Sequence, residues 1–199
     1  GPLDMRMGNN DLTAAEVINE SNEKTLSDII YKLGEEPKSR RIAKAIVNYR
    51  KNKTIDSTYE LAEIVRGAIG FIKNKKIDPA TKTFQAIRIK VNNELEELIN
   101  ALEDTKKLLL PGARLVIITF HSLEDRIVKT FIKSNCGFIY NPSRYSLDVY
   151  KNPENSKAIF KLLTKKIIRS SLEQNKINKR ARSAKLRAVE RVLDFADAA

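Results

Sequence analysis

The segment PGARLVIITFHSLEDRIVKTFIK, residues 111–133, changes from a strand pattern to a helix pattern within a few residues. Residues 115–120 carry no charge, are rich in β-branched side chains, and follow the turn pair Pro111-Gly112. Such an uncharged run between turn residues predicts a strand buried on both faces, as in a parallel sheet. A strand followed directly by a helix indicates the α/β class.

The helix pattern begins where this strand ends. Its apolar face would be formed by Leu123, Ile127, Val128, Phe131 and Ile132. Ser122 is the expected N-cap, and Glu124 and Asp125 suit the first turn, near the positive end of the helix dipole. His121 and Ser122 would lie at the carboxyl end of the strand, where open α/β sheets bind their ligands. This strand end is the first candidate site.

Composition narrows the class of protein. The chain has 199 residues, of which 42% are hydrophobic, enough for one good core or two small ones. No run approaches the roughly 18 apolar residues of a membrane span, so no membrane partner is expected. Cys136 is the only cysteine and His121 the only histidine, which argues against a disulfide framework and against a metal site. A reducing compartment, the cytoplasm or an organelle matrix, is expected.

Charge is concentrated in the second half of the chain. The net charge of the whole chain is +12, and most of the excess lies in residues 111–199. A basic half suggests a polyanionic partner such as nucleic acid, although a lysine-rich surface that is simply solvated has the same composition. The density is highest around Arg180, Arg182, Lys185 and Arg187, which could follow a phosphate backbone.

The first 70 residues have helical patterns. Thr13 with Glu16, and Ser57 with Glu60, are capping-box pairs that each open an apolar helical repeat. Two further amphipathic segments lie between them, the first ending near Gly34. Four short helices with brief connections predict a small helical module.

A longer helix is expected next, followed by an incomplete sheet. Asp78 and Pro79 are a predicted N-cap and first helical residue, and an apolar stripe then continues to Leu109. On this helix Gln85, Arg88, Asn92 and Asn93 could share a polar face, or could be a solvated face with one buried hydrogen bond. Residues 159–168 and 184–192 are candidate strands, with a basic loop at 175–183 and a surface excursion at 134–156. No glycine-rich loop joins a strand to a helix, so the sheet is incomplete by its own pattern.

The strand end allows more than one chemical interpretation. A nucleophile elbow is not present, because Ser122 is not part of G-x-S-x-G. A Ser–His–Asp triad is disfavoured, because adjacent residues at a strand end rarely face each other. Ser122, Glu124 and Asp125 are most simply capping residues, whereas His121 could be a ligand-end residue or a structural one.

Five segments resemble a known family. They are GPLDMRM (residues 1–7), GEE with RRIAKAIV (34–47), ATKTFQAIRIKVNNELEEL (80–98), FHSLEDRIVK (120–129) and RARSAKLRAVER (180–191). Together and in this order they resemble the bacterial small-subunit ribosomal RNA cytosine-N4 methyltransferase family, also called MraW, which has a mitochondrial relative. The likeness covers nearly the whole chain outside residues 134–158.

The resemblance implies a Rossmann-like methyltransferase fold with an inserted all-helical domain. Residues 1–8 would be a loop near the active site, 9–77 the inserted helical RNA-recognition domain, and 78–199 the carboxy-terminal half of the Rossmann-like domain. The implied cofactor is S-adenosylmethionine, and the residues that contact it are expected upstream of Gly1. The chain is then expected to be the carboxy-terminal portion of such an enzyme, with an incomplete sheet and no activity alone.

The resemblance also implies partners, and the position and charge of individual residues within it suggest the site residues. The expected substrate is a cytosine amine in small-subunit ribosomal RNA or the ribosomal subunit, with His121, Ser122 and Asp125 at the rim of the active site. The expected RNA-binding residues are Arg40, Arg41, Arg88, Arg182, Lys185 and Arg187, of which Arg88 would also order the site. A homodimer or a complementing amino-terminal half is a further expected partner. The location would be the cytoplasm or, alternatively, the mitochondrial matrix.

A second hypothesis belongs to another functional class. The chain would be a non-catalytic RNA-binding or ribosome-assembly module, derived from the same family, that keeps the helical module and the basic segment. The two hypotheses differ in whether a cofactor pocket is completed elsewhere.

Overall fold

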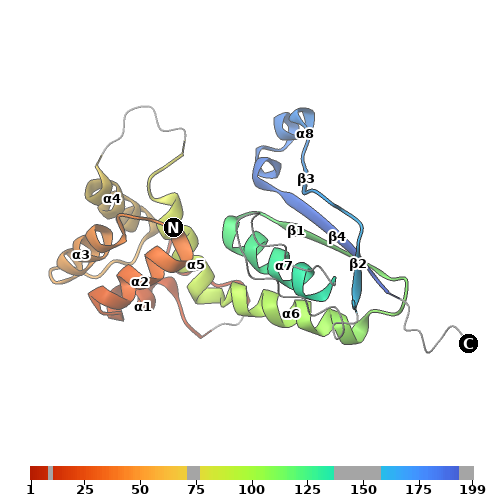
Figure 1. Ribbon diagram of the computed structural model, residues 1–199. Helices are drawn as coiled ribbons and strands as arrows, with labels where there is room; N and C mark the ends of the chain where they lie inside the picture. The colour runs from red at the N-terminus through yellow and green to blue at the C-terminus, as the bar shows by residue number, and fades with distance from the viewer. Residues whose placement is uncertain (9–10, 71–76, 137–157, 193–199) are drawn as a thin grey trace, which may run out of the picture. The chain divides into compact units, whose positions relative to one another are not determined.

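The computed structural model describes residues 1–8, 11–70, 77–136 and 158–192, and it divides the chain into two compact units (Figure 1). The first unit is Gly1–Glu94 and the second is Leu95–Ala199. Among the described residues, no helix is both long and apolar enough to cross a membrane. The boundary between residues 77 and 78 that the family resemblance implies stays a prediction, and the compact units divide between Glu94 and Leu95.

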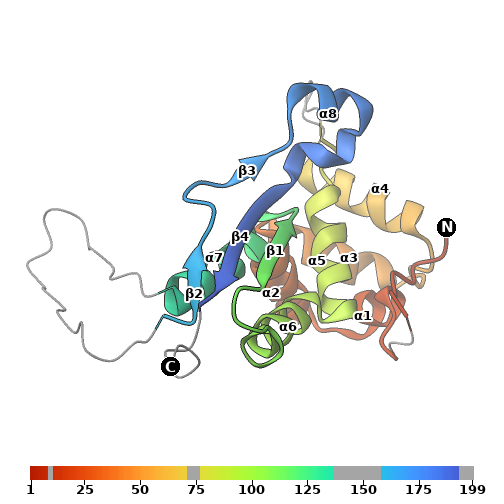
Figure 2. The ribbon, with the colours of Figure 1, turned by 90° about the vertical axis from the view of Figure 1, so that its right-hand side faces the viewer.

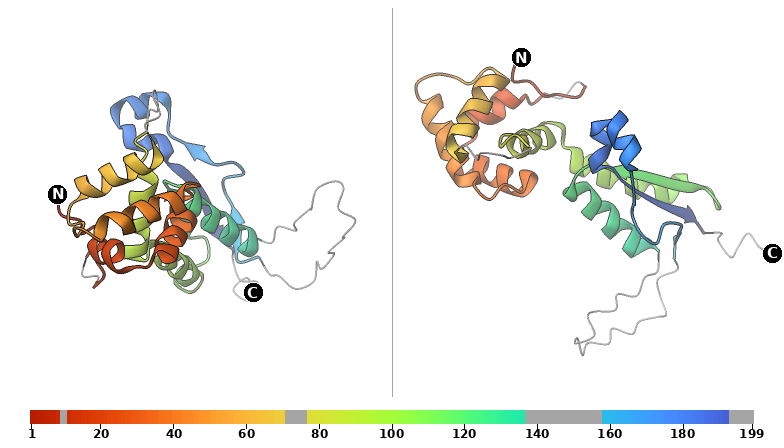
Figure 3. Two further views of the ribbon diagram at one scale, coloured as in Figure 1. Left: turned by 90° about the vertical axis from the view of Figure 1, so that its left-hand side faces the viewer. Right: turned by 90° about the horizontal axis from the view of Figure 1, so that it is seen from above.

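The first unit is a bundle of helices (Figure 3). The helices are α1 (Ala14–Glu20), α2 (Glu23–Gly34), α3 (Ser39–Arg50), α4 (Thr58–Ile69) and α5 (Thr81–Asn92). Its core contains Ile18, Leu26, Ile30, Ile42, Ile46, Leu61, Val65 and Ile87, all fully buried. The predicted N-caps Thr13 and Ser57 are confirmed, because each accepts a hydrogen bond from the backbone N–H three residues later. The helical module is therefore as predicted, with α5 added to it.

Gly34 is the point of closest approach between α2 and α5. A Cβ atom at this position would lie 2.5 Å from the backbone oxygen of Lys82 and 3.1 Å from the Cβ of Ala86. A backbone oxygen cannot move aside as a flexible side chain can, so only glycine fits here. Gly34 therefore ends α2 and also sets how closely α5 packs on it.

The long helix predicted from Asp78 to Leu109 is wrong in two respects. It begins later, at Thr81, with Ala80 as the residue before it, although Asp78 accepts a hydrogen bond from the Ala80 N–H at 2.8 Å and forms an ion pair with Arg66. It also breaks at Asn93, whose φ of 48° lies in the left-handed region. Asparagine tolerates that conformation better than most residues do. The stripe is thus divided between α5 and α6 (Glu94–Leu108).

The second unit places α6 and α7 against a small sheet (Figure 2). The elements after α6 are β1 (Arg114–Thr119), α7 (Ser122–Asn135), β2 (Phe160–Leu162), β3 (Ile168–Arg169), α8 (Leu172–Ile177), the 3-10 helix η1 (Lys179–Ser183) and β4 (Lys185–Arg191). The strand order is β1-β4-β2, β3 also pairs with β4, and every pairing is antiparallel. Helices packed on a sheet confirm the α/β class in this broad sense.

Two predictions about this unit need correction. The strands expected at 159–168 and 184–192 are present, the first as the short strands β2 and β3. The basic loop expected at 175–183 is wrong, because Ser171 and Asn178 accept capping hydrogen bonds that start α8 and η1. The surface excursion expected at 134–156 falls largely on residues 137–157, outside the described residues.

Strand β1 is covered on one face only within the described residues. Leu115 and Ile117 pack into a core with Val128, Phe131 and Phe160, whereas Val116 and Ile118 are more than half exposed. The prediction of a parallel strand buried on both faces is therefore wrong for the described chain. Residues two apart share a face of a strand, and the helices of this unit cover only the face that holds Leu115 and Ile117. Both faces are apolar, so composition alone did not distinguish them.

Candidate functional site

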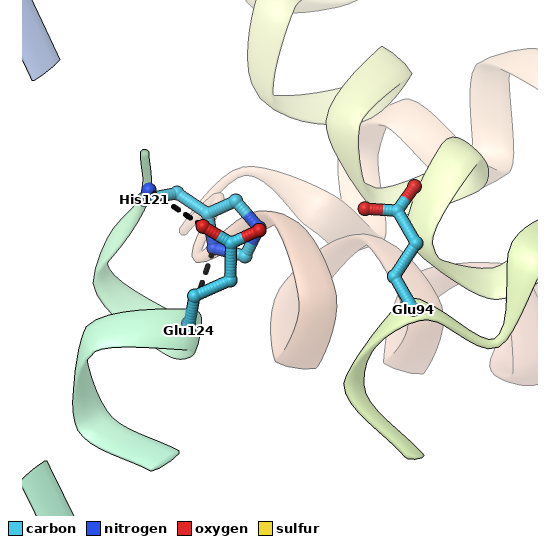
Figure 4. Close-up of side chains that lie close together, drawn as sticks. All are labelled: Glu94, His121 and Glu124. Atoms are coloured by element: carbon cyan, nitrogen blue, oxygen red, sulfur yellow. Dashed lines mark hydrogen bonds and ion pairs between the residues drawn. The ribbon is translucent and has the colours of Figure 1, made fainter. Parts of the chain in front are cut away.

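His121 follows β1 and caps helix α7. Its Nδ1 accepts a hydrogen bond from the Glu124 N–H at 3.4 Å, and Glu124 Oε2 accepts from the N–H groups of His121 at 3.2 Å and Phe120 at 2.7 Å (Figure 4). This is a capping box with histidine in the N-cap position. The prediction of Ser122 as N-cap is wrong by one residue, since Ser122 is the first residue of the helix.

The same pair has a second, charge-based contact. His121 Nε2 lies 3.2 Å from Glu124 Oε1, and the histidine side chain is only 10% exposed. Burial acts to raise the pKa of Glu124, but hydrogen bonds from His121 and from the Phe120 N–H outweigh it, so this pKa lies below its ordinary value. Nδ1 of His121 accepts a hydrogen bond within the cap, whereas Nε2 is buried beside the Glu124 carboxylate without a hydrogen bond to any described residue.

Asp125 forms a second cluster one residue further along α7. Its Oδ1 accepts a hydrogen bond from Arg187 Nε at 3.0 Å, and its Oδ2 lies 3.4 Å from Lys185 Nζ. Burial acts to raise the pKa of Asp125, but the two cations lower it below the ordinary value. The carboxylate therefore stays ionised and holds the start of α7 to β4. It is bound by Arg187 and Lys185 rather than by His121, so the disfavoured Ser–His–Asp arrangement is not formed.

A cavity of about 230 Å³ opens beside this strand end. Its cationic lining comes from three elements: Arg169 at the end of β3, Arg182 in η1 and Lys185 at the start of β4. His121, Ser122 and Ser183 contribute polar groups to the same wall. Such a lining can hold an anion through charge-assisted hydrogen bonds.

The structure brings together most of the site residues predicted in the second unit. His121, Ser122, Arg182 and Lys185 line one cavity, and Asp125 contacts Lys185. Arg187 is 18% exposed and engaged by Asp125. Its RNA-binding role stays a prediction, and the ion pair gives it a structural role that the sequence pattern did not indicate.

Arg169 is the cavity residue that sequence reasoning missed. It stands in a two-residue strand with no motif around it, so the sequence held no local signal. The register of the sheet pairs Arg169 with Lys185, which brings it to the cavity. A search for basic residues opposite Lys185 in a hairpin would have found it.

The predicted residues of the first unit have separate surroundings. Arg40 and Arg41 are exposed on α3. Arg88 makes a two-pronged contact with Glu94, at 2.7 and 2.9 Å. Asn92 donates to the Met5 carbonyl at 2.9 Å and accepts from the Met7 N–H at 2.6 Å. Part of the polar face of α5 therefore anchors the first residues of the chain, so it is more than a solvated surface.

Fold and site define an α/β protein with a basic, histidine-capped strand end. The chain belongs to the MraW methylase family, whose model matches residues 1–192. This match confirms the resemblance drawn from the five sequence segments.

Curated relatives carry one name, "Ribosomal RNA small subunit methyltransferase H". The protein of that name from Rickettsia prowazekii (strain Madrid E) is 52% identical over 193 residues, which cover 97% of this chain and 62% of the relative. Those from Rickettsia felis and Rickettsia massiliae are each 53% identical over 194 residues, again covering 62% of the relative. The chain thus spans less than two thirds of the length of these relatives.

Proposed function

We propose that this chain forms part of an S-adenosylmethionine-dependent methyltransferase that modifies the N4 amine of a cytosine in small-subunit ribosomal RNA. The observation that carries the proposal is the family match across residues 1–192, together with relatives named as small-subunit ribosomal RNA methyltransferases. The proposal includes a finer assignment of the fold. The sheet of this chain would belong to a Rossmann-like sheet that is completed by strands outside these residues. Residues 9–77 would be an inserted RNA-recognition domain, and residues 1–8 a loop near the active site.

RNA binding is assigned to two sets of cations. Arg182 and Lys185 line the basic cavity beside the strand end, and Arg40 and Arg41 are exposed on α3. Phosphate contacts of this kind position an RNA without reading its sequence. The target cytosine would also have to be unstacked or presented in a loop, because its amine is inaccessible inside a helix.

The strand end is assigned a positioning role. An exocyclic cytosine amine is a weak nucleophile, because its lone pair is delocalised into the ring, so the reaction depends on placement and on an acceptor for the departing proton. In this chain Nδ1 of His121 and the carboxylate of Asp125 are already engaged by Glu124, Arg187 and Lys185. We therefore assign His121 and Asp125 to holding the shape of the active-site rim, on which Ser122 also lies.

The described residues do not supply a cofactor pocket of the expected kind. The turn from β1 to α7 is Phe120-His121 and contains no glycine, whereas dinucleotide and related cofactors are usually held by a glycine-rich strand-to-helix turn. The cytoplasmic location and the homodimer stay predictions.

Calorimetry with S-adenosylmethionine tests the proposal. The chain is titrated alone and again after mixing with the part of a Rickettsia relative that it does not match. Binding only in the mixture supports an enzyme whose pocket is completed by that part. Binding by the chain alone would overturn the assignment of the pocket. No binding in either case, with RNA binding intact, would favour the non-catalytic RNA-binding module.

A further inference from the structure

We propose that the cavity lined by Arg169, Arg182 and Lys185 holds one phosphodiester group of single-stranded RNA. This inference rests on the proposed function, since it names a subsite for the RNA partner. The first support is convergence: β3, η1 and β4 each bring one cation to a cavity of about 230 Å³. They meet because Arg169 pairs with Lys185 in the sheet and η1 leads directly into β4.

The charge of the cavity is only partly compensated. None of the described residues that line it is acidic. Lys185 shares its charge with Asp125, but the guanidinium groups of Arg169 and Arg182 have no hydrogen bond or ion pair to any described residue. Guanidinium is planar and presents paired N–H groups that match two oxygens of a phosphate. Two such groups on one small cavity therefore favour an anion with several oxygens.

Size distinguishes a single phosphate from a whole ligand. The volume of about 230 Å³ lies below the roughly 300–1,000 Å³ of most small-molecule sites. The cavity is therefore of a size that suits a small anion such as one phosphate group.

A neighbouring cavity favours a nucleic-acid chain over a free ion. This second cavity, of about 500 Å³, shares Arg169 and Ala184 with the basic one. Its other walls include Ile118, Ile177 and Leu186, with Gln174 and Asn178 supplying polar groups. A phosphate bound at Arg169 thus has space beside it for the attached sugar or base, which a free phosphate ion would not use.

RNA binding by matched variants of the whole 199-residue chain tests the inference. The probe is a fluorescent single-stranded RNA oligonucleotide, and the readout is anisotropy over a range of salt concentrations. Arg182→Ala and Arg169→Ala should each weaken binding about tenfold and should lower the slope of log affinity against log salt by about 1. The control, Arg114→Ala, removes an exposed arginine at the start of β1, away from the strand end and outside the cavity lining, and it should change affinity less than about twofold.

A second arm distinguishes a specific phosphate contact from diffuse attraction. The oligonucleotide is remade with single uncharged methylphosphonate linkages, one position at a time. One linkage should weaken binding to the unmodified chain and have no further effect on Arg182→Ala, because both changes remove the same contact.

Each outcome decides a different point. Equal losses for Arg114→Ala and Arg182→Ala, or no linkage that couples to Arg182, would overturn the phosphate subsite and leave RNA binding standing. Displacement of the RNA by inorganic phosphate at concentrations comparable to those of the oligonucleotide would assign the cavity to a free ion. Failure of the unmodified chain to bind any RNA would overturn the RNA part of the proposed function itself.

Discussion

Gly34 illustrates how a single residue controls the packing of two helices. Substituting Gly34 by Ala would place a Cβ 2.5 Å from the backbone oxygen of Lys82. Separating α2 from α5 should cost about 1–3 kcal/mol of unfolding free energy, measured by urea unfolding with circular dichroism. Gly67→Ala is the control, because its Cβ would meet nothing within 4 Å. That variant should gain about 0.5–1 kcal/mol, and a similar loss in both variants would refute the close-packing account.

Asp125 is expected to make the stability of the second unit depend on pH. Its pKa is lower in the folded chain than in the unfolded one, so its contribution is present at neutral pH and is lost as pH falls through the folded pKa. Asp125→Asn should cost about 1–3 kcal/mol at pH 7. The difference from the unmodified chain should begin to shrink near the ordinary aspartate pKa of about 4 and should disappear only below the lower folded pKa of Asp125. Amide hydrogen exchange in β4 would report this unit directly. A difference that persists in acid would rule out the ion pairs as its cause.

His121 provides a test that separates capping from proton transfer. Asparagine is a good N-cap and alanine is not, so His121→Asn should keep most of the stability and His121→Ala should lose about 1 kcal/mol. In a full-length relative, a positioning role predicts that the Asn variant retains methylation better than the Ala variant does. Equal loss of methylation in both would instead point to a direct role of the imidazole, and unchanged methylation in both would remove His121 from the site.

At the scale of elements, β1 has one buried and one open face. Val116 and Ile118 are exposed, whereas Leu115 and Ile117 pack into the core. An exposed apolar strand favours self-association. Ile118→Lys should therefore reduce concentration-dependent association in light scattering and leave the fold intact, whereas Ile117→Lys should unfold the second unit. If the Ile118→Lys variant associates as strongly as the unmodified chain, the exposed face of β1 is not the surface through which the chain self-associates.

Helix ends were predictable where the cap and the first turn are close in sequence. The capping boxes at Thr13 and Ser57 depend on residues only three positions apart. At Asp78 the side chain accepts a hydrogen bond from the Ala80 N–H and also contacts Arg66, twelve residues earlier, but the helix itself begins at Thr81. The contact with a distant partner is one that spacing alone cannot reveal.

At the scale of the whole molecule, the proposed Rossmann-like sheet predicts that this chain and the part of its relatives that it does not match stabilise each other. Mixing the chain with the unmatched part of a Rickettsia relative should raise its unfolding temperature, because ligands that bind only the folded state stabilise it. Ile118→Lys should reduce that gain if the added part covers the open face of β1. Differential scanning calorimetry would measure both effects, and an unchanged unfolding temperature in the mixture would contradict the proposed completion of the sheet.

The sequence by itself determined the helical module, the strand at 114–119, the helix after it and the family, because these depend on periodicity, capping and ordered motifs within short segments. Only the tertiary structure decided the antiparallel pairing, the exposed face of β1, the Asp125–Arg187 contact and the meeting of Arg169 with Lys185. The physical reason is that register and ion pairs join residues far apart in the chain. Arg187 shows the difference: its neighbours in sequence suggest a phosphate contact, but its place in β4 turns it towards the carboxylate of Asp125.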